Sequence, residues 1–140
     1  MKNSLAKVAA KSAAALVLLG FATTQANATT GSFPAGIGTT DPCTNVPLTV
    51  HGITTLSITK TPRNIIVFEL FFGSEGGYDV FYTGFGAYST PSPTYLVTIN
   101  GVWVGPSPFR STGIDQIFAT NNGLVPTGDS IQSFKDTCGF

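Results

Sequence analysis

The acidic residue Glu69 is the most unusual chemical group in this sequence, because it lies inside the apolar run IIVFELFF (65–72). An unpaired buried carboxylate is costly, and burial raises its pKa towards the range of a general acid. Glu69 could therefore work with Asp79 as a pair of carboxyl groups, as in glycoside hydrolysis. We favour a structural role, in which Glu69 faces solvent or pairs with one of three cations: Lys60, Arg63 or Arg110.

The single histidine, His51, is the other candidate for acid–base chemistry. A Ser–His–Asp site needs such a base beside a nucleophile, with an acid to orient it. The nucleophile motif G-x-S-x-G is missing from the sequence. We therefore expect His51, beside Gly52 at the end of a predicted strand, to form a structural hydrogen bond rather than to catalyse.

Two further carboxylates, Glu75 and Asp79, flank Gly76-Gly77. Oxygen ligands on a glycine-rich loop could hold Ca²⁺, which takes 6–8 oxygens. The spacing fits no standard calcium loop, so these residues predict a weak site at most. No residue pattern calls for a cofactor.

Aromatic residues are frequent on or beside the predicted strands, and aromatic rings can stack on sugars or dock against proteins. If exposed, they would predict a binding surface for a carbohydrate or a protein partner. Burial in the core is the alternative, because a small domain needs large apolar side chains. The candidate ligand-binding rings are Tyr78, Tyr82, Phe85, Tyr88, Tyr95 and Trp103.

The two cysteines, Cys43 and Cys138, predict one disulfide. An even cysteine count in an exported chain indicates disulfide bonding, and no C-x-x-C spacing suggests metal or redox chemistry. The bond would tie the last strand to the first across most of the chain.

The export prediction rests on residues 1–28, which have three lysines, a short apolar run and the small-residue site Ala26-Asn27-Ala28. This is the pattern of a cleaved secretory signal, and the apolar run is too short to span a bilayer. Without these residues the net charge is −3, since all seven acids but only four cations remain. A weakly acidic chain argues against nucleic-acid binding. We therefore expect a secreted or periplasmic protein, exported by the general secretory route.

Short alternating runs separated by glycine and proline predict the fold. We expect a flexible leader over 29–42 and an all-β domain over 43–140, an antiparallel β-sandwich or small barrel of about seven or eight short strands. The run 65–72 and the run 78–85 should form a hairpin. Asn100-Gly101 predicts a second, tight hairpin turn.

These features favour an exported, non-catalytic protein that binds a ligand or forms surface interactions. One alternative is a small secreted hydrolase that uses Glu69 with Asp79, or His51. Another is an inhibitor or toxin-like effector that acts through a protruding loop such as 73–77.

Overall fold

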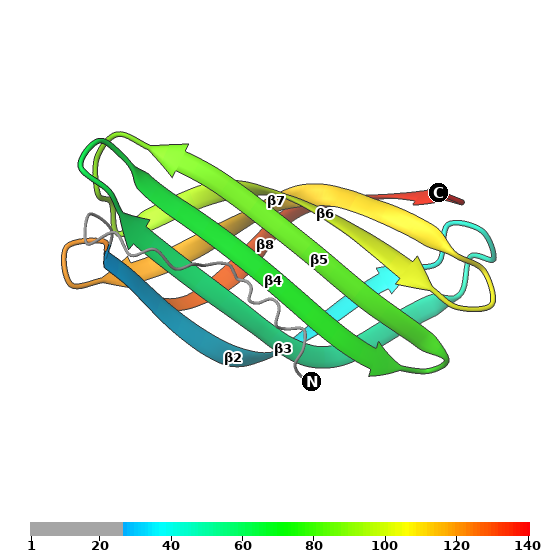
Figure 1. Cartoon of the computed structure of the whole chain (residues 1–140). Coiled ribbons are helices and arrows are strands. Elements are labelled where there is room, and N and C mark those ends of the chain that lie inside the picture. The colour runs from blue at the N-terminus through cyan, green and yellow to red at the C-terminus, as the bar shows by residue number, and fades with distance from the viewer. Residues whose placement is uncertain (1–26) are drawn as a thin grey trace.

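The computed structural model describes residues 27–140 and shows one antiparallel sheet of seven strands, which curls into a half-barrel (Figure 1). Each strand pairs with the next one along the chain, so the sheet order is the sequence order. The predicted all-β class is confirmed, with a single curled sheet rather than two stacked ones. The strands are β2 (Asn27–Thr40), β3 (Pro47–Lys60), β4 (Ile65–Glu75), β5 (Tyr78–Tyr88), β6 (Thr94–Val104), β7 (Phe109–Thr120) and β8 (Val125–Cys138).

Alternation along the strands creates the core. In β4 the odd-numbered residues from 65 to 73 are buried on the concave face, while the even-numbered ones point outwards. The same period of two runs through β5, β6 and most of β7. The concave face therefore closes around aliphatic and aromatic side chains, the largest of which are Trp103, Tyr82, Phe71 and Phe109.

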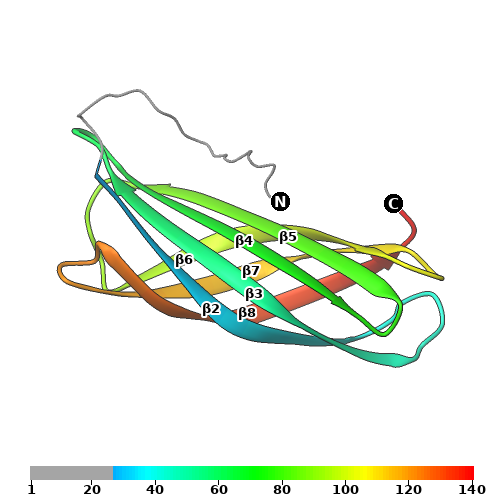
Figure 2. The same ribbon diagram turned by 60° about the horizontal axis from the view of Figure 1, so that its bottom comes forward.

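The two edge strands, β2 and β8, approach each other without pairing through their backbones, and we call the gap between them the seam. Both ribbon views show them running side by side along the open side of the half-barrel (Figures 1 and 2). The predicted disulfide is confirmed: Cys43 and Cys138 are bonded, with their Cα atoms 5.0 Å apart. Near this end of the seam, the Thr39 hydroxyl also donates a hydrogen bond to the Asp136 carboxylate.

The predicted flexible leader (29–42) is wrong for most of its length, because residues up to Thr40 belong to β2. This strand pairs with β3 along its whole length, from Asn27 opposite Lys60 to Thr40 opposite Pro47. Local sequence gives little sign of this strand, since its pairing is set by the hairpin with β3 and by burial of Ile37. The predicted signal peptide covers residues 1–28. Residues 1–26 of it lie outside the described residues, and residues 27 and 28 belong to β2.

The hairpin turn predicted at Asn100-Gly101 is also wrong, because both residues lie within the continuous strand β6. Gly101 pairs with Tyr82 of β5. A Cβ atom on Gly101 would lie 2.5 Å from the Tyr82 ring, so glycine here makes room for a core aromatic. The hairpin between β4 and β5 does form, with a turn at Gly76 and Gly77, which both have positive φ.

No helix within residues 27–140 has the length and the apolar character to cross a membrane.

Candidate functional site

Three carboxylates from separate strands meet inside the half-barrel, and we call Glu69, Asp115 and Asp129 the acidic cluster. Glu69 lies on β4, Asp115 on β7 and Asp129 on β8. One carboxylate oxygen from each residue lies within 4.8 Å of those of the other two. Within residues 27–140, this is the one group of three or more acidic, histidine or cysteine side chains close enough to share a metal ion.

Two of the three carboxylates are deeply buried, and most of their oxygens lack partners among the described residues. Glu69 is 3% exposed and Asp115 is 0% exposed. Oε1 of Glu69 and both carboxylate oxygens of Asp115 have no hydrogen-bond partner among the described residues. Glu69 therefore points inwards with Ile65, Val67 and Phe71, which lie on the same face of β4. The expected solvent exposure of Glu69, or its pairing with a lysine or arginine, is wrong.

Burial raises the pKa of Glu69, and the nearby Asp129 charge raises it further, while contact with Asp115 offsets part of the effect. Burial also raises the pKa of Asp115, with added contributions from Asp129 and Glu69. Close, buried carboxylates resist ionising together, so Glu69 and Asp115 favour their protonated forms unless something else supplies positive charge.

A cavity of about 290 Å³ leads from the seam to the acidic cluster. Residues 34–37 of β2 line one side of the cavity, Asp129 and Ile131 of β8 line the other, and Glu69 lies among the lining residues. The cluster is therefore reached through the gap that the unpaired edge strands leave open.

The structure does not bring the other predicted catalytic residues to Glu69. Asp79 is on the outer face of β5, where it accepts a hydrogen bond of 2.6 Å from the Ser74 hydroxyl. His51 is on the outer face of β3, and its Nδ1 lies 2.8 Å from Oε1 of Glu75. The His51 backbone N–H donates to the same oxygen, and these contacts lower the pKa of Glu75. Glu75 and Asp79 thus have protein partners, and within residues 27–140 they form no cluster with a third acid.

Four of the six aromatic residues considered as ligand-binding candidates are in the core, which is the alternative that the sequence left open for them. The Tyr78 hydroxyl donates to buried Asp41 at 2.8 Å, and the Tyr95 hydroxyl donates to the Gly123 carbonyl at 2.6 Å. The indole N–H of Trp103 donates to the Tyr82 hydroxyl at 2.6 Å. Tyr88 is partly buried against the core, and Phe85 alone is well exposed.

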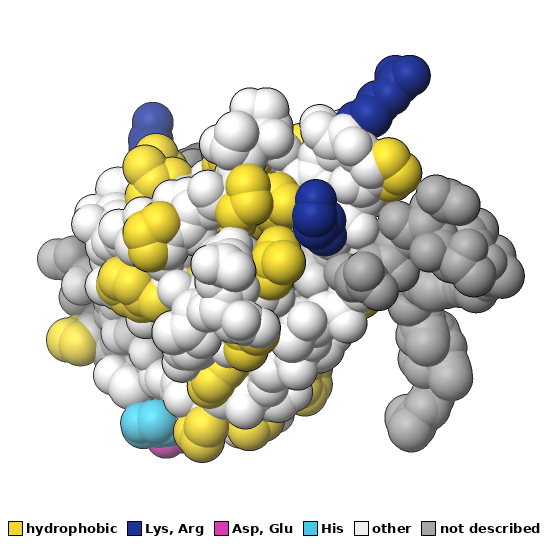
Figure 3. Space-filling model, turned by 90° about the vertical axis from the view of Figure 1, so that its left-hand side faces the viewer, with side chains coloured by type: hydrophobic (Ala, Val, Ile, Leu, Met, Phe, Trp, Pro, Cys, Tyr) yellow, Lys and Arg dark blue, Asp and Glu magenta, His cyan; other side chains and the backbone are white. Residues whose placement is uncertain are grey.

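The exposed aromatic surface is instead made of phenylalanines on β4 and β5, which we call the phenylalanine face. Phe68 pairs with Phe85 and Phe72 pairs with Phe81 across the two strands. Their side chains are exposed, at 40% for Phe68, 58% for Phe85, 57% for Phe72 and 44% for Phe81. More exposed apolar side chains lie on the neighbouring strands: Ile53, Leu96, Val102 and Val104. Figure 3 views the molecule from the left-hand side of Figure 1 and shows hydrophobic side chains scattered at that surface among uncharged ones, with lysine or arginine side chains projecting from it.

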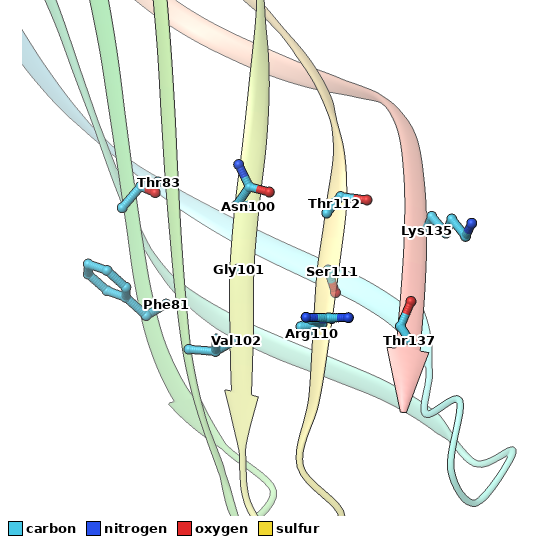
Figure 4. A pocket seen from close by; sticks show the side chains of 10 residues that line it. All are labelled: Phe81, Thr83, Asn100, Gly101, Val102, Arg110, Ser111, Thr112, Lys135 and Thr137. Carbon is cyan, nitrogen blue, oxygen red and sulfur yellow. The ribbon is translucent and has the colours of Figure 1, made fainter. Parts of the chain in front are cut away.

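A shallow groove of about 500 Å³ borders this face on the outside of β5 to β8 (Figure 4). Phe81 lies at its β5 side, and its lining includes Asn100, Arg110 and Lys135 but no acidic residue. One aromatic ring together with amide, hydroxyl and cationic groups is compatible with binding of a saccharide. A carbohydrate partner for this groove stays a prediction.

Comparisons of this chain with protein-family models, with curated proteins and with solved structures find no match to any of them.

Proposed function

We propose that this chain is an exported, non-catalytic structural protein that associates with further copies of itself through the phenylalanine face. The observation that carries the proposal is the exposure of two cross-strand phenylalanine pairs on the outer surface, Phe68 opposite Phe85 and Phe72 opposite Phe81. Large aromatic side chains held in the open are costly in a monomer and are typical of interaction sites.

The exposed area fits an interface. A buried aromatic side chain covers about 150–250 Å², so four half-exposed rings offer roughly 400 Å². A stable interface takes about 800 Å² from each partner, so the rings supply about half of it. The apolar side chains on the flanking strands, among them Ile53 and Val102, extend the same face.

The charge pattern favours a second copy of the chain as the partner. Among the outward-facing side chains of β4 to β6, Asp79 and the turn residue Glu75 are the charged ones, and both lie at one end of the hairpin. An almost uncharged face can meet its own copy without like-charge repulsion, as a two-fold interface requires. The disulfide is compatible with an oxidising, exported location, where a stable structural component would need such a bond.

A hydrolase is the weaker proposal, because its candidate residues lie on opposite faces of the sheet. Glu69 points into the half-barrel, whereas Asp79 and His51 point outwards. General acid–base catalysis needs both groups within reach of one substrate.

Sedimentation analysis over a range of protein concentrations tests the proposal. We expect the protein to self-associate. Each truncated ring should cost more than about 1.4 kcal/mol of binding free energy, which is a tenfold change. The double variant Phe72→Thr/Phe85→Thr should therefore raise the dissociation constant by roughly 100-fold or more. Phe140→Thr is the matched control, because Phe140 is 66% exposed but lies beyond the end of β8. A protein that stays monomeric at every concentration, or a double variant that associates like the control, would overturn the proposal.

A further inference from the structure

Among residues 27–140, no lysine, arginine or histidine side chain forms an ion pair with the acidic cluster. The one ion pair within residues 27–140 joins His51 to Glu75 on the outer surface, away from the interior. Glu69 and Asp115 are nearly or fully buried, yet three of their four carboxylate oxygens lack a hydrogen-bond partner among the described residues. Buried charges in proteins are paired or coordinate metals, so these oxygens indicate a missing positive partner.

The donor set indicates the chemical class of that partner. The cluster offers carboxylate oxygens alone, with no histidine nitrogen or cysteine sulfur. Such oxygen ligands suit hard cations rather than zinc or copper. Ca²⁺ takes 6–8 oxygens and accepts carboxylates in one- or two-oxygen contact, so three carboxylates can supply up to half a dozen ligands.

The surroundings leave a path and an additional oxygen for such an ion. The cavity from the seam reaches Glu69 and Asp129, and it is also lined by Thr54, which carries a hydroxyl group. Gly84 of β5 lies opposite Glu69 of β4. A Cβ atom on Gly84 would lie 3.4 Å from the Glu69 Cβ and 2.8 Å from Ile99 Cγ2. The glycine therefore keeps the wall beside Glu69 free of a further side chain.

We propose that Glu69, Asp115 and Asp129 bind one calcium ion inside the half-barrel. The ion reaches this site through the seam between β2 and β8. The ion links β4 on one wall of the half-barrel to β7 and β8 on the other. It therefore holds the curled sheet closed in a region where β2 and β8 share no backbone hydrogen bonds.

Terbium luminescence tests this site directly, because Tb³⁺ replaces Ca²⁺ and emits when a nearby aromatic ring is excited. Tyr82 lines the same cavity, and Trp103 donates a hydrogen bond to its hydroxyl. Tyr82 can therefore transfer excitation energy to a bound Tb³⁺ ion, and Trp103 can transfer energy by way of Tyr82. We expect chelator-treated protein to show saturable Tb³⁺ emission that Ca²⁺ displaces. We also expect Ca²⁺ to raise the melting temperature, since an ion that binds the folded state alone stabilises it.

Two amide variants and one control sharpen the test. Asp115→Asn and Asp129→Asn should each weaken Tb³⁺ and Ca²⁺ binding by roughly tenfold or more, because each removes one of three charged ligands. The part-exposed position of Asp129 keeps one variant available if Asp115→Asn fails to fold. Glu75→Gln, which alters an exposed carboxylate outside the cluster, should bind like the unaltered protein. Absence of saturable emission and of a calcium-induced melting shift in the unaltered protein would overturn the proposal, as would equal binding by Asp129→Asn.

Discussion

Removal of the disulfide should cost a large share of the protein's stability. The change is Cys43→Ser with Cys138→Ser, which leaves no lone thiol behind. The bond closes a loop with a sequence separation of 95 residues. In the chain-entropy model, opening a loop of that length costs about 4.7 kcal/mol at 25 °C, because the unfolded chain regains the freedom that the bond removed.

The contacts that remain near the disulfide are too weak to compensate for its loss. The disulfide joins the end of β8 to the residues just after β2, at the seam where these strands have no backbone pairing. Side-chain contact between Thr39 and Asp136 remains there, with the Gly139 N–H donating to the Pro108 carbonyl at 3.0 Å. Such hydrogen bonds contribute about 1 kcal/mol each, so they cannot replace the bond.

Urea unfolding followed by circular dichroism measures this loss through linear extrapolation. Domains of this size have free energies of unfolding of about 5–15 kcal/mol, so a loss of about 4–5 kcal/mol is at least about a quarter of the total. The control is the unaltered protein after its disulfide has been reduced. Reduction alone should lower the free energy of unfolding by the same amount. A change below about 1 kcal/mol would refute the reasoning that the disulfide restrains the unfolded chain.

Two further predictions concern the interior. Asp41 is buried, which would raise its pKa, but hydrogen bonds from Tyr78 and from the backbone N–H groups of Cys43 and Thr44 lower it on balance. A carboxyl whose pKa is lower in the folded state stabilises the protein above its unfolded pKa, and this contribution is lost as the pH falls through the folded pKa. Asp41→Asn should therefore reduce the free energy of unfolding at pH 7. Urea titrations should show that the difference in this free energy between the variant and the unaltered protein narrows below about pH 4. An equal difference at pH 3 and pH 7 would contradict this. Gly101→Ala should lower stability by about 1–3 kcal/mol, because its Cβ would lie 2.5 Å from the Tyr82 ring. A melting temperature equal to that of the unaltered protein would show that this close contact is absent.

Local patterns predict part of this fold well. Alternation in 65–72 correctly groups Glu69 with Ile65, Val67 and Phe71, and the glycines after it correctly indicate the β4–β5 turn. Local patterns fail where a distant partner decides the structure. Asn100-Gly101 has the residues of a tight turn, but it lies opposite Tyr82, whose ring needs the space that glycine leaves.

The acidic cluster could be predicted only in part. Glu69 is conspicuous in the sequence, and alternation in β7 places Asp115 on the same face as Ile117 and Ala119, which are buried. Asp129 sits in a stretch that has the composition of a turn, so nothing local assigns it to the interior. The curl of the sheet brings β4 to β7 and β8, and that curvature depends on packing across the whole core.

Self-association through the phenylalanine face is the central claim, and photo-crosslinking tests it most directly. Phe85 is replaced by p-benzoylphenylalanine, which keeps an aromatic ring at the most exposed position of the face. Isotope-labelled and unlabelled copies are mixed and irradiated, and mass spectrometry locates the crosslinks. We predict crosslinks between copies that join position 85 to residues of β4 or β5. No crosslink between copies, or no more than the same reagent gives at position 140, would contradict the claim.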